Sequence, residues 1–380
     1  MGKDSLKVKK GASTSTDPVQ AVRELAAAIR QPDAKLTLFY CSPDYDLEVL
    51  GRALADEFGD VDLVGCTTAG EITPAGYLSG SLTGVSIASD DFHAVTTRID
   101  DLRAFELAHG EAAAEDALKQ MREHGVQPDG SNSFGFLLID GLSTKEEGVV
   151  ASVYRALGDI QLFGGSAGDG TRFGATHIYH QGAFRQSSAV LTLVHTGHPF
   201  RVFKTQHFVS SDDKMVVTQA DPDRRIVTEI NGEPAGREYA RMVGLDVDHL
   251  TPLIFAAYPV VVKLGGNYYV RSIQKVNEDE SLSFFCAIDE GIVLTVARGV
   301  DLVENLETTF DGLRDDIGEP ELVLGCDCIL RNLECEQREI KERVGELMSR
   351  NNVIGFATYG EQFNAMHVNQ TFTGVAIGSR

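Results

Sequence analysis

Apolar and polar residues follow one another along this chain in an order that repeats. A short apolar run is followed by a polar turn, then by apolar residues at helical spacing, and then by glycine-rich apolar segments. The first example predicts strands at residues 36–41, 61–71 and 82–88 and a helix at 46–58. Asp44 or Asp46 is placed to cap this helix at its N-terminus.

Two later stretches repeat this order of elements. The second predicts a strand, a helix, a glycine-rich strand and two more strands at residues 134–140, 145–157, 161–169, 173–179 and 189–195. The third predicts a strand, a helix and a closing glycine-rich segment at residues 322–326, about 333–348 and 354–378. One structural unit is therefore expected three times.

The glycine-rich segments of the first and third units are copies of each other. Residues 65–89 and 355–379 align without a gap at an offset of 290, and 10 of the 25 positions are identical. Chance would give about one or two identities at average composition. We therefore predict that the two segments form equivalent elements. The same offset pairs Tyr77 with His367.

The stretch between the second and third units differs in composition. Turn signals at residues 221–223 and 231–234 precede a predicted helix at 238–245. The remaining elements predicted here are strands at 268–273 and 283–288 and a helix at 301–313. We place a domain boundary near residue 220.

The whole pattern predicts a mixed α/β (α+β) fold. Two related lobes, residues 20–220 and 221–380, are built from repeated strand–helix–strand units with helices layered on sheets. Residues 1–19 are rich in Lys, Ser and Thr and are expected to be a disordered lead-in.

Composition narrows the classes of function. The 34 Lys and Arg residues against 56 Asp and Glu give a net charge of −22, which disfavours nucleic acid and anionic membrane surfaces as partners. No apolar run approaches the length of a membrane span, and the first residues lack the apolar core of a secretory signal. Six cysteines in 380 residues fit a reducing cytoplasm. We expect a cytoplasmic protein and leave a homo-oligomer open.

The glycine-rich run at residues 164–170 resembles a phosphate-binding loop but lacks the lysine of a P-loop. We expect these glycines to permit tight turns and close packing, with nucleotide binding as the less favoured interpretation. The chain has no Gly-x-Ser-x-Gly elbow and no carboxylate pair whose spacing suggests acid–base catalysis. We therefore expect a protein that is not an enzyme.

Cys326, Cys328 and Cys335 are a candidate thiolate group. Their spacing does not match a zinc ribbon and no fourth ligand stands near them. Structural or redox-sensitive thiols are the favoured interpretation.

Among the ten histidines, His367 has the most apolar neighbours in the sequence. It follows Met366, stands between Phe363 and Phe372, and lies in a segment framed by glycines. An uncharged imidazole in such surroundings suits iron, although a hydrogen-bonded core histidine is the more common arrangement. Tyr77 is a less favoured second ligand, since tyrosine also binds ferric haem.

Four motifs together resemble the FIST family of sensory proteins, which contain a FIST N and a FIST C domain. They are Val64 to Glu71, Phe163 to Asp169, Leu324 to Arg331 and Gly355 to Asn364, and the resemblance covers about residues 34–378. It assigns residues 20–220 to FIST N and 221–380 to FIST C.

The chain looks most like the branch of that family that contains nitric-oxide-sensing haem proteins. This resemblance implies haem b held by His367 as axial iron ligand, with Met366, Phe363 and Phe372 around it. It also implies nitric oxide as the signal and a sensor histidine kinase in a two-component system as the partner. The alternatives are a sensor of a small organic ligand such as an amino acid, without haem, and a redox sensor using Cys326, Cys328 and Cys335.

Overall fold

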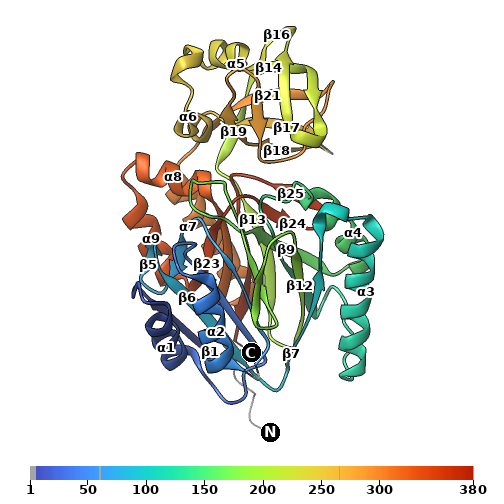
Figure 1. Ribbon diagram of the computed structural model, residues 1–380, viewed down its shortest axis with the longest axis vertical. Coiled ribbons are helices and arrows are strands. Elements are labelled where there is room, and N and C mark those ends of the chain that lie inside the picture. The colour runs from blue at the N-terminus through green and yellow to red at the C-terminus, as the bar shows by residue number, and fades with distance from the viewer. Residues whose placement is uncertain (1–5, 60, 265, 380) are drawn as a thin grey trace.

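Three mixed sheets of six strands each form the larger part of the molecule, and a smaller domain lies beyond one end of them (Figure 1). This is a computed structural model, which describes residues 6–59, 61–264 and 266–379. The mixed α/β class predicted from the sequence is confirmed.

The three sheets have the same internal order. Each contains an edge strand, its antiparallel neighbour, two parallel strands and a hairpin. The first sheet consists of β1 (Lys7–Ser13), β6 (Leu82–Ala88), β2 (Leu36–Cys41), β3 (Leu63–Thr67), β10 (Ile178–His180) and β11 (Ala183–Arg185). The second consists of β7 (Phe92–Ile99), β12 (Ala189–Thr196), β8 (Ser133–Ile139), β9 (Gln161–Ser166), β24 (Glu361–Phe363) and β25 (Met366–Val368). The third consists of β13 (Phe200–Thr205), β26 (Phe372–Gly378), β22 (Pro320–Cys328), β23 (Val353–Thr358), β4 (Glu71–Thr73) and β5 (Gly76–Leu78).

Each unit gives its hairpin to the sheet of another unit. The hairpin β4–β5 pairs with β23 of the third unit, β10–β11 pairs with β3 of the first, and β24–β25 pairs with β9 of the second. The exchange closes a ring of three units, so each sheet is completed by a segment distant in sequence. The three sheets enclose a shared apolar core that includes Tyr40, Phe136 and Phe356.

The predicted duplication is confirmed. Strands β3, β4, β5 and β6 correspond to β23, β24, β25 and β26 at the offset of 290 residues, although the hairpin turns differ, with a positive φ at Gly76 in the first copy and at Asn364 in the second. In both copies the last strand pairs antiparallel with the first strand of its unit, β6 with β2 and β26 with β22.

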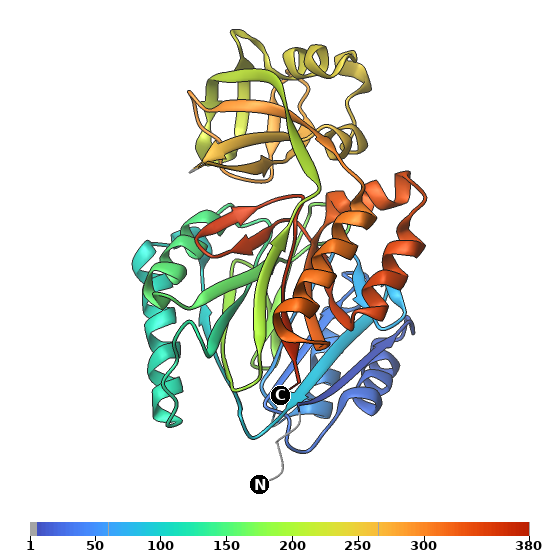
Figure 2. The same ribbon diagram turned by 180° about the vertical axis from the view of Figure 1, so that it is seen from behind.

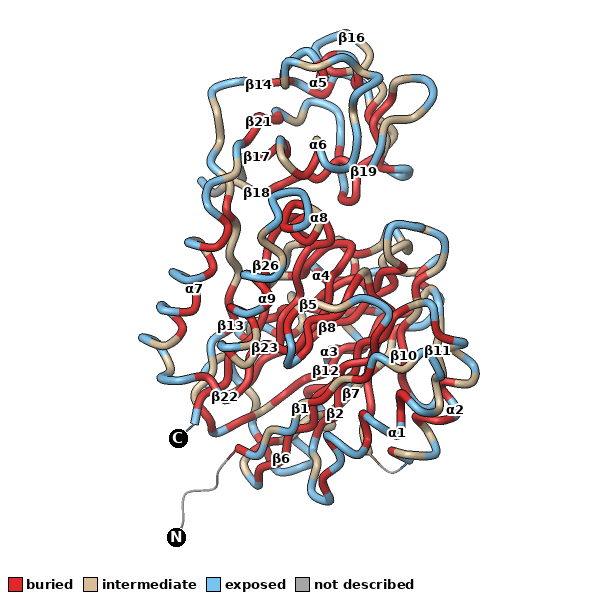
Figure 3. Tube along the Cα trace, turned by 90° about the vertical axis from the view of Figure 1, so that its left-hand side faces the viewer, coloured by how far each residue is buried: buried red, intermediate tan, exposed pale blue. Residues whose placement is uncertain are grey.

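Helices cover the outer faces of the sheets (Figure 2). They are α1 (Pro18–Ile29), α2 (Leu47–Phe58), α3 (Leu107–Glu123), α4 (Glu146–Leu157), α7 (Leu302–Ile317), α8 (Ile329–Gln337) and α9 (Lys341–Arg350), with a 3-10 turn at Leu102–Ala104. Asp46 and Asp301 accept backbone N–H bonds at the starts of α2 and α7, as N-caps do. Along α7 buried and exposed residues alternate, as expected for a helix with one face on a sheet (Figure 3).

The smaller domain is an insertion between β13 and α7. Its strands are β14 (Phe208–Asp221), β15 (Ile226–Ile230), β16 (Glu233–Pro234), β17 (Val260–Leu264), β18 (Asn267–Arg271), β19 (Ile273–Val276), β20 (Leu282–Phe284) and β21 (Val293–Gly299). Its helices are α5 (Ala235–Val243) and α6 (Pro252–Ala257), with 3-10 turns at Pro222–Arg224 and Val247–His249. The entering and leaving chain segments lie side by side, since the N–H of Val300 donates to the carbonyl of His207 at 2.8 Å. Residue 220, the boundary predicted from the sequence, lies within β14.

Three local predictions need correction. The lead-in predicted to be disordered contains β1, which pairs antiparallel with β6 and forms the edge strand of the first sheet. Residues 1–5 lie outside the described residues. The predicted helix at 333–348 is two helices, separated by a turn in which Glu339 has a φ of 57°. The strand predicted at 173–179 is formed only at Ile178–His180. None of the helices in the described residues combines the length and the apolar character needed to cross a bilayer.

Candidate functional site

The three exchanged hairpins differ at one pair of facing residues. In each hairpin, the first residue of this pair also lies opposite a glycine of the neighbouring strand. These glycines are Gly355, Gly65 and Gly164. The pairs are Ile72 with Tyr77, Tyr179 with Phe184, and Gln362 with His367. Two pairs are therefore apolar or aromatic, and the third is polar although both of its residues are buried, whereas Tyr77 and Phe184 are half-buried.

His367 is buried, with 2% of its surface exposed. Its Nδ1 lies 3.4 Å from Nε2 of Gln362, which itself donates to Oγ of Ser166 at 3.0 Å. The Nε2 of His367 makes no well-aligned hydrogen bond with the described residues, although a backbone group of Phe285 lies close enough to the imidazole to raise its pKa. Burial lowers the pKa of His367 to about 4, although the charge of Glu147 opposes the shift, so the imidazole is uncharged at neutral pH.

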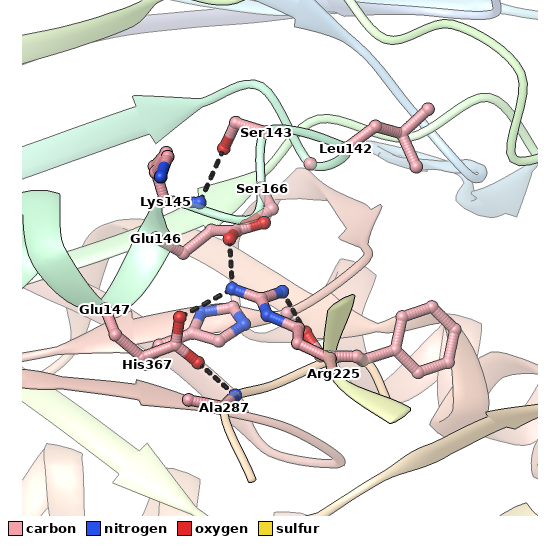
Figure 4. Close-up of polar contacts among 12 residues, drawn as sticks. Leu142, Ser143, Lys145, Glu146, Glu147, Ser166, Arg225, Ala287 and His367 are labelled. Carbon is pink, nitrogen blue, oxygen red and sulfur yellow. Dashed lines mark hydrogen bonds and ion pairs between the residues drawn. The ribbon is translucent and has the colours of Figure 1, made fainter. Parts of the chain in front are cut away.

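An arginine of the small domain joins that domain to the start of α4 beside His367. Nη2 of Arg225 lies 2.5 Å from Oε2 of both Glu146 and Glu147, and its Nη1 donates to the carbonyl of Phe285 at 2.6 Å. Figure 4 shows the imidazole of His367 beside this guanidinium and the carboxylate of Glu147. Burial raises the pKa of Glu146 to about 7, although the charge of Arg225 opposes the shift.

Further buried polar atoms around His367 lack partners among the described residues. Arg271 has 8% of its surface exposed, and its Nε and Nη1 make no hydrogen bond; its charge acts on His367, as that of Arg225 does. Both amide atoms of Asn369 are unpartnered and the residue is fully buried. A Cβ added to Gly360 would lie within 2.8 Å of both Nδ2 of Asn369 and Nε2 of His367.

We call this group the His367 cluster. It contains His367, Gln362, Asn369, Gln370, Arg225, Arg271, Glu146 and Glu147. Oε1 of Gln362 and Oε1 of Gln370 are unpartnered as well, while Nε2 of Gln370 donates to the carbonyl of Ala256 at 2.9 Å. Buried polar atoms without partners are costly, so such a concentration indicates a place for water or for a polar ligand.

The other residues grouped with His367 from the sequence lie elsewhere. Phe372 packs against Phe203 and Phe310, under α7. Phe363 and Met366 line a groove beside the small domain. Tyr77 hydrogen bonds through its hydroxyl to Asp327, and burial raises its pKa well above the usual value.

As they are arranged, the residues around His367 do not fit haem b. Gly360 is so close that an added Cβ would lie 2.3 Å from Cε1 of the imidazole. The side chains next to His367 are polar or charged, and the aromatic residues expected to flank a porphyrin are directed into other parts of the molecule. A haem group at this imidazole would require the hairpin to rearrange.

The cysteines are enclosed. Cys326, Cys328 and Cys335 are each about 1% exposed, and burial raises the pKa of all three thiols, that of Cys335 to about 12. A thiol with a raised pKa is a poor nucleophile. Within the described residues, no group of three or more His, Cys, Asp or Glu side chains is arranged to hold a metal ion.

The glycine-rich run has the close packing expected for it. A Cβ added to Gly164 would lie 2.0 Å from the carbonyl oxygen of Leu137. The carboxylate of Asp169 accepts the N–H groups of Phe173, Gly174 and Ala175 at 2.8 to 2.9 Å. These bonds hold residues 173–175 in a loop, which explains why the strand predicted there is short.

Comparison of the two copies contains a signal for the cluster that sequence reasoning missed. At the offset of 290, Ile72 is replaced by Gln362 in the hairpin in which His367 replaces Tyr77, and Gly80 is replaced by Gln370 just after that hairpin. Arg225, Arg271, Glu146 and Glu147 carry no such signal, because they come from parts of the chain outside the duplication.

The model of the FIST N domain matches residues 35–233, and the model of the FIST C domain matches residues 235–364. No curated protein matches the chain. Among solved structures, the chain is similar to one described as "T. maritima PurL complexed with FGAR", with 10% identity over 98% of this chain and 73% of that chain. The TM-score of 0.22 is too low for any argument about fold or function.

Proposed function

We propose that this chain, which belongs to the FIST family, senses a small polar molecule at the His367 cluster. FIST domains are sensor domains of signal transduction. The observation that carries the proposal is the concentration of buried, unpartnered polar atoms between the β24–β25 hairpin and the small domain.

The unpartnered atoms have a chemistry of their own. The Nε and Nη1 of Arg271 lie on different edges of the guanidinium, and each can donate one charge-assisted hydrogen bond to a carboxylate oxygen. The free amide oxygens of Gln362, Asn369 and Gln370 accept hydrogen bonds, as an ammonium group requires. A free amino acid, or a similar small zwitterion, could bond to both the free donors of Arg271 and the free amide oxygens.

Ligand binding at this position would act on the small domain. The domain contributes Arg225 and Arg271, while the sheets contribute His367 and its hairpin. A ligand that bridges the two parts stabilises their closed arrangement over any open one, because it binds only the closed one fully. A partner protein that recognises one arrangement would register the ligand.

We propose a sensor histidine kinase as that partner, acting in two-component signalling. The proposal rests on the resemblance to the haem-binding branch of the family, in which such kinases are the partners.

The test is a thermal-shift screen of free amino acids and small carboxylates, followed by calorimetry on each hit. Arg271→Met should abolish the binding of the hit, because one aliphatic side chain replaces the two free donors. Arg237→Met is the matched control, since Arg237 lies in the same domain with its side chain 64% exposed. Binding that survives Arg271→Met would contradict the assignment.

A haem b sensor of nitric oxide, as in the NosP branch of the family, is the competing proposal. The uncharged imidazole of His367 with its unpartnered Nε2 favours it, and the enclosed polar surroundings oppose it. An absorption spectrum of the protein after incubation with haemin distinguishes the two proposals, because only iron held by the protein gives a shifted Soret band.

A further inference from the structure

A groove separate from the His367 cluster lies between the small domain and the tip of the β24–β25 hairpin. It has a volume of about 830 Å³ and is formed by β13, β14, the β17–β18 hairpin, α4 and residues 363–366. This volume is in the range of pockets that hold small organic molecules.

Most of the bulky side chains that line the groove are aromatic or sulfur-containing. They are Tyr154, Phe208, Tyr268, Tyr269, Phe363 and Met366. Aromatic rings and a methionine sulfur favour flat apolar molecules, which they contact by stacking and by polarizable contacts.

Lys204 is the one cationic residue among the described residues that line the groove. Nζ of Lys204 lies 5.2 Å from the centroid of the Tyr269 ring and 3.4 Å from Oε1 of Gln206. The described residues that line the groove include no aspartate or glutamate. In a chain with a net charge of −22, this ammonium group is a local exception, since no carboxylate of the described lining residues neutralises it.

We propose that this groove binds an aromatic carboxylate, with the ring against the aromatic wall and the carboxylate on Lys204. A carboxylate at Nζ would form a hydrogen bond in which both partners are charged, in place of the long 3.4 Å bond to the neutral amide of Gln206. The ring would cover apolar surface that the groove leaves open.

The groove also touches the strand that carries His367. Met366 lines the groove, whereas His367, the next residue of β25, is directed into the cluster on the other face of the strand. The two sites are therefore adjacent but use different side chains, and the proposal for the groove does not depend on the proposal for the cluster.

The experiment compares two probes of equal shape by calorimetry on the full chain, naphthalene-2-carboxylate and the uncharged naphthalene-2-carboxamide. We expect the carboxylate to bind about tenfold or more tightly than the amide, which is the effect of one hydrogen bond to a charged group. Lys204→Met should remove this preference, while Lys204→Arg should keep it.

Lys263→Met is the matched control, because Lys263 lies 5.4 Å from the Tyr268 ring at an exposed position. It should leave the preference for the carboxylate in place. Equal affinity for the two probes, saturable binding of neither, or a preference that survives Lys204→Met would each overturn the proposal. Thermal midpoints of all variants show that the fold is retained.

Discussion

Tyr77 and His367 occupy the same position in two copies of one hairpin, and each lies at a different connection to the small domain. Tyr77 bonds to Asp327, whose Oδ1 accepts from Arg331 at 2.6 Å. Arg331 in turn lies 2.7 Å from Nδ1 of His207, in the segment that leads into the small domain. His367 lies beside Arg225 of that domain.

The two copies of the hairpin therefore lie at two connections between the sheets and the small domain. At the first, Nε2 of His207 lies 2.8 Å from Oε2 of Glu334, and the network leaves Nη2 of Arg331 unpartnered among the described residues. The second, around His367, leaves unpartnered atoms on His367, Gln362, Asn369, Gln370 and Arg271. We infer from this larger number that the second connection depends on a ligand more than the first.

The first prediction concerns the fixed connection. Tyr77→Phe removes one hydroxyl from Asp327 but leaves its bond to Arg331. We expect a loss of about 1.5–3 kcal/mol in the free energy of unfolding, as for one buried hydrogen bond to a charged group. Urea unfolding measures it, and Tyr268→Phe, whose ring lines the open groove, is the control. An unchanged midpoint for Tyr77→Phe would show that the bond does not stabilise the fold.

A second prediction concerns the ion pair between the domains. Arg225→Met leaves Glu146 and Glu147 without their cation, in positions where Glu146 is buried. Removing one partner of a buried pair costs about 3–5 kcal/mol in other proteins, so the contact should open. Hydrogen exchange should then become faster in the first turn of α4 and in residues 285–287, which bond to this group. Arg237→Met should leave those rates unchanged, and equal rates in both variants would contradict the role given to Arg225.

Much of the fold could be predicted from the sequence because its cause is local. The apolar runs specify β2 and β6 to the residue, and Asp46 marks the start of α2. The ring of exchanged hairpins could not be predicted, because Glu71 and Ile72 carry no sign that they pair with β23 instead of their own sheet. Only part of the site could be predicted from the sequence. His367 differs from its copy, but its neighbours Arg225 and Arg271 reach it only through the packing of an inserted domain.

The third prediction concerns pH and a carboxyl group repeated in the two copies. Glu71 accepts from Ser81 and Glu361 from Thr371 in the same geometry. Burial raises the pKa of Glu71 to about 7 and of Glu361 to about 8, although these hydrogen bonds oppose the shift. Above about pH 4.3, the ordinary pKa of glutamate, the unfolded chain releases these protons. The folded protein still holds them on the two carboxyl groups.

Since the folded state binds more protons, its stability falls as pH rises from about 4.5 towards 8. The amide in Glu361→Gln cannot titrate, so this variant does not show the loss of stability that Glu361 causes as pH rises. The unfolding free energy of the variant minus that of the wild type should rise by at most about 1.4 kcal/mol per pH unit in this window. Urea titrations at several pH values measure it. A difference independent of pH would show that Glu361 is ionised in the folded protein.

A fourth prediction tests the thiol interpretation. The six cysteines are free and buried, so iodoacetamide should label them slowly in the folded protein and rapidly in urea. Mass spectrometry counts the labelled sites. Fast labelling of Cys326, Cys328 or Cys335 without urea would support the redox sensor instead.

The last prediction uses His367→Ala to separate the two proposals for the cluster. If the site binds a small zwitterion, the variant folds, loses a group beside the ligand and binds the screened hit more weakly. The wild type should then show no Soret band beyond that of free haemin. If the site binds haem, the wild type shows a shifted Soret band that the variant lacks, since His367 supplies the iron ligand.

His195→Ala is the control, because that half-buried imidazole lies on a distant strand, β12. The backbone should tolerate the change, as the equivalent position holds Tyr77 in the other copy. A wild-type Soret band that persists in His367→Ala would exclude His367 as the ligand. Unchanged binding of the hit in His367→Ala would place the zwitterion elsewhere.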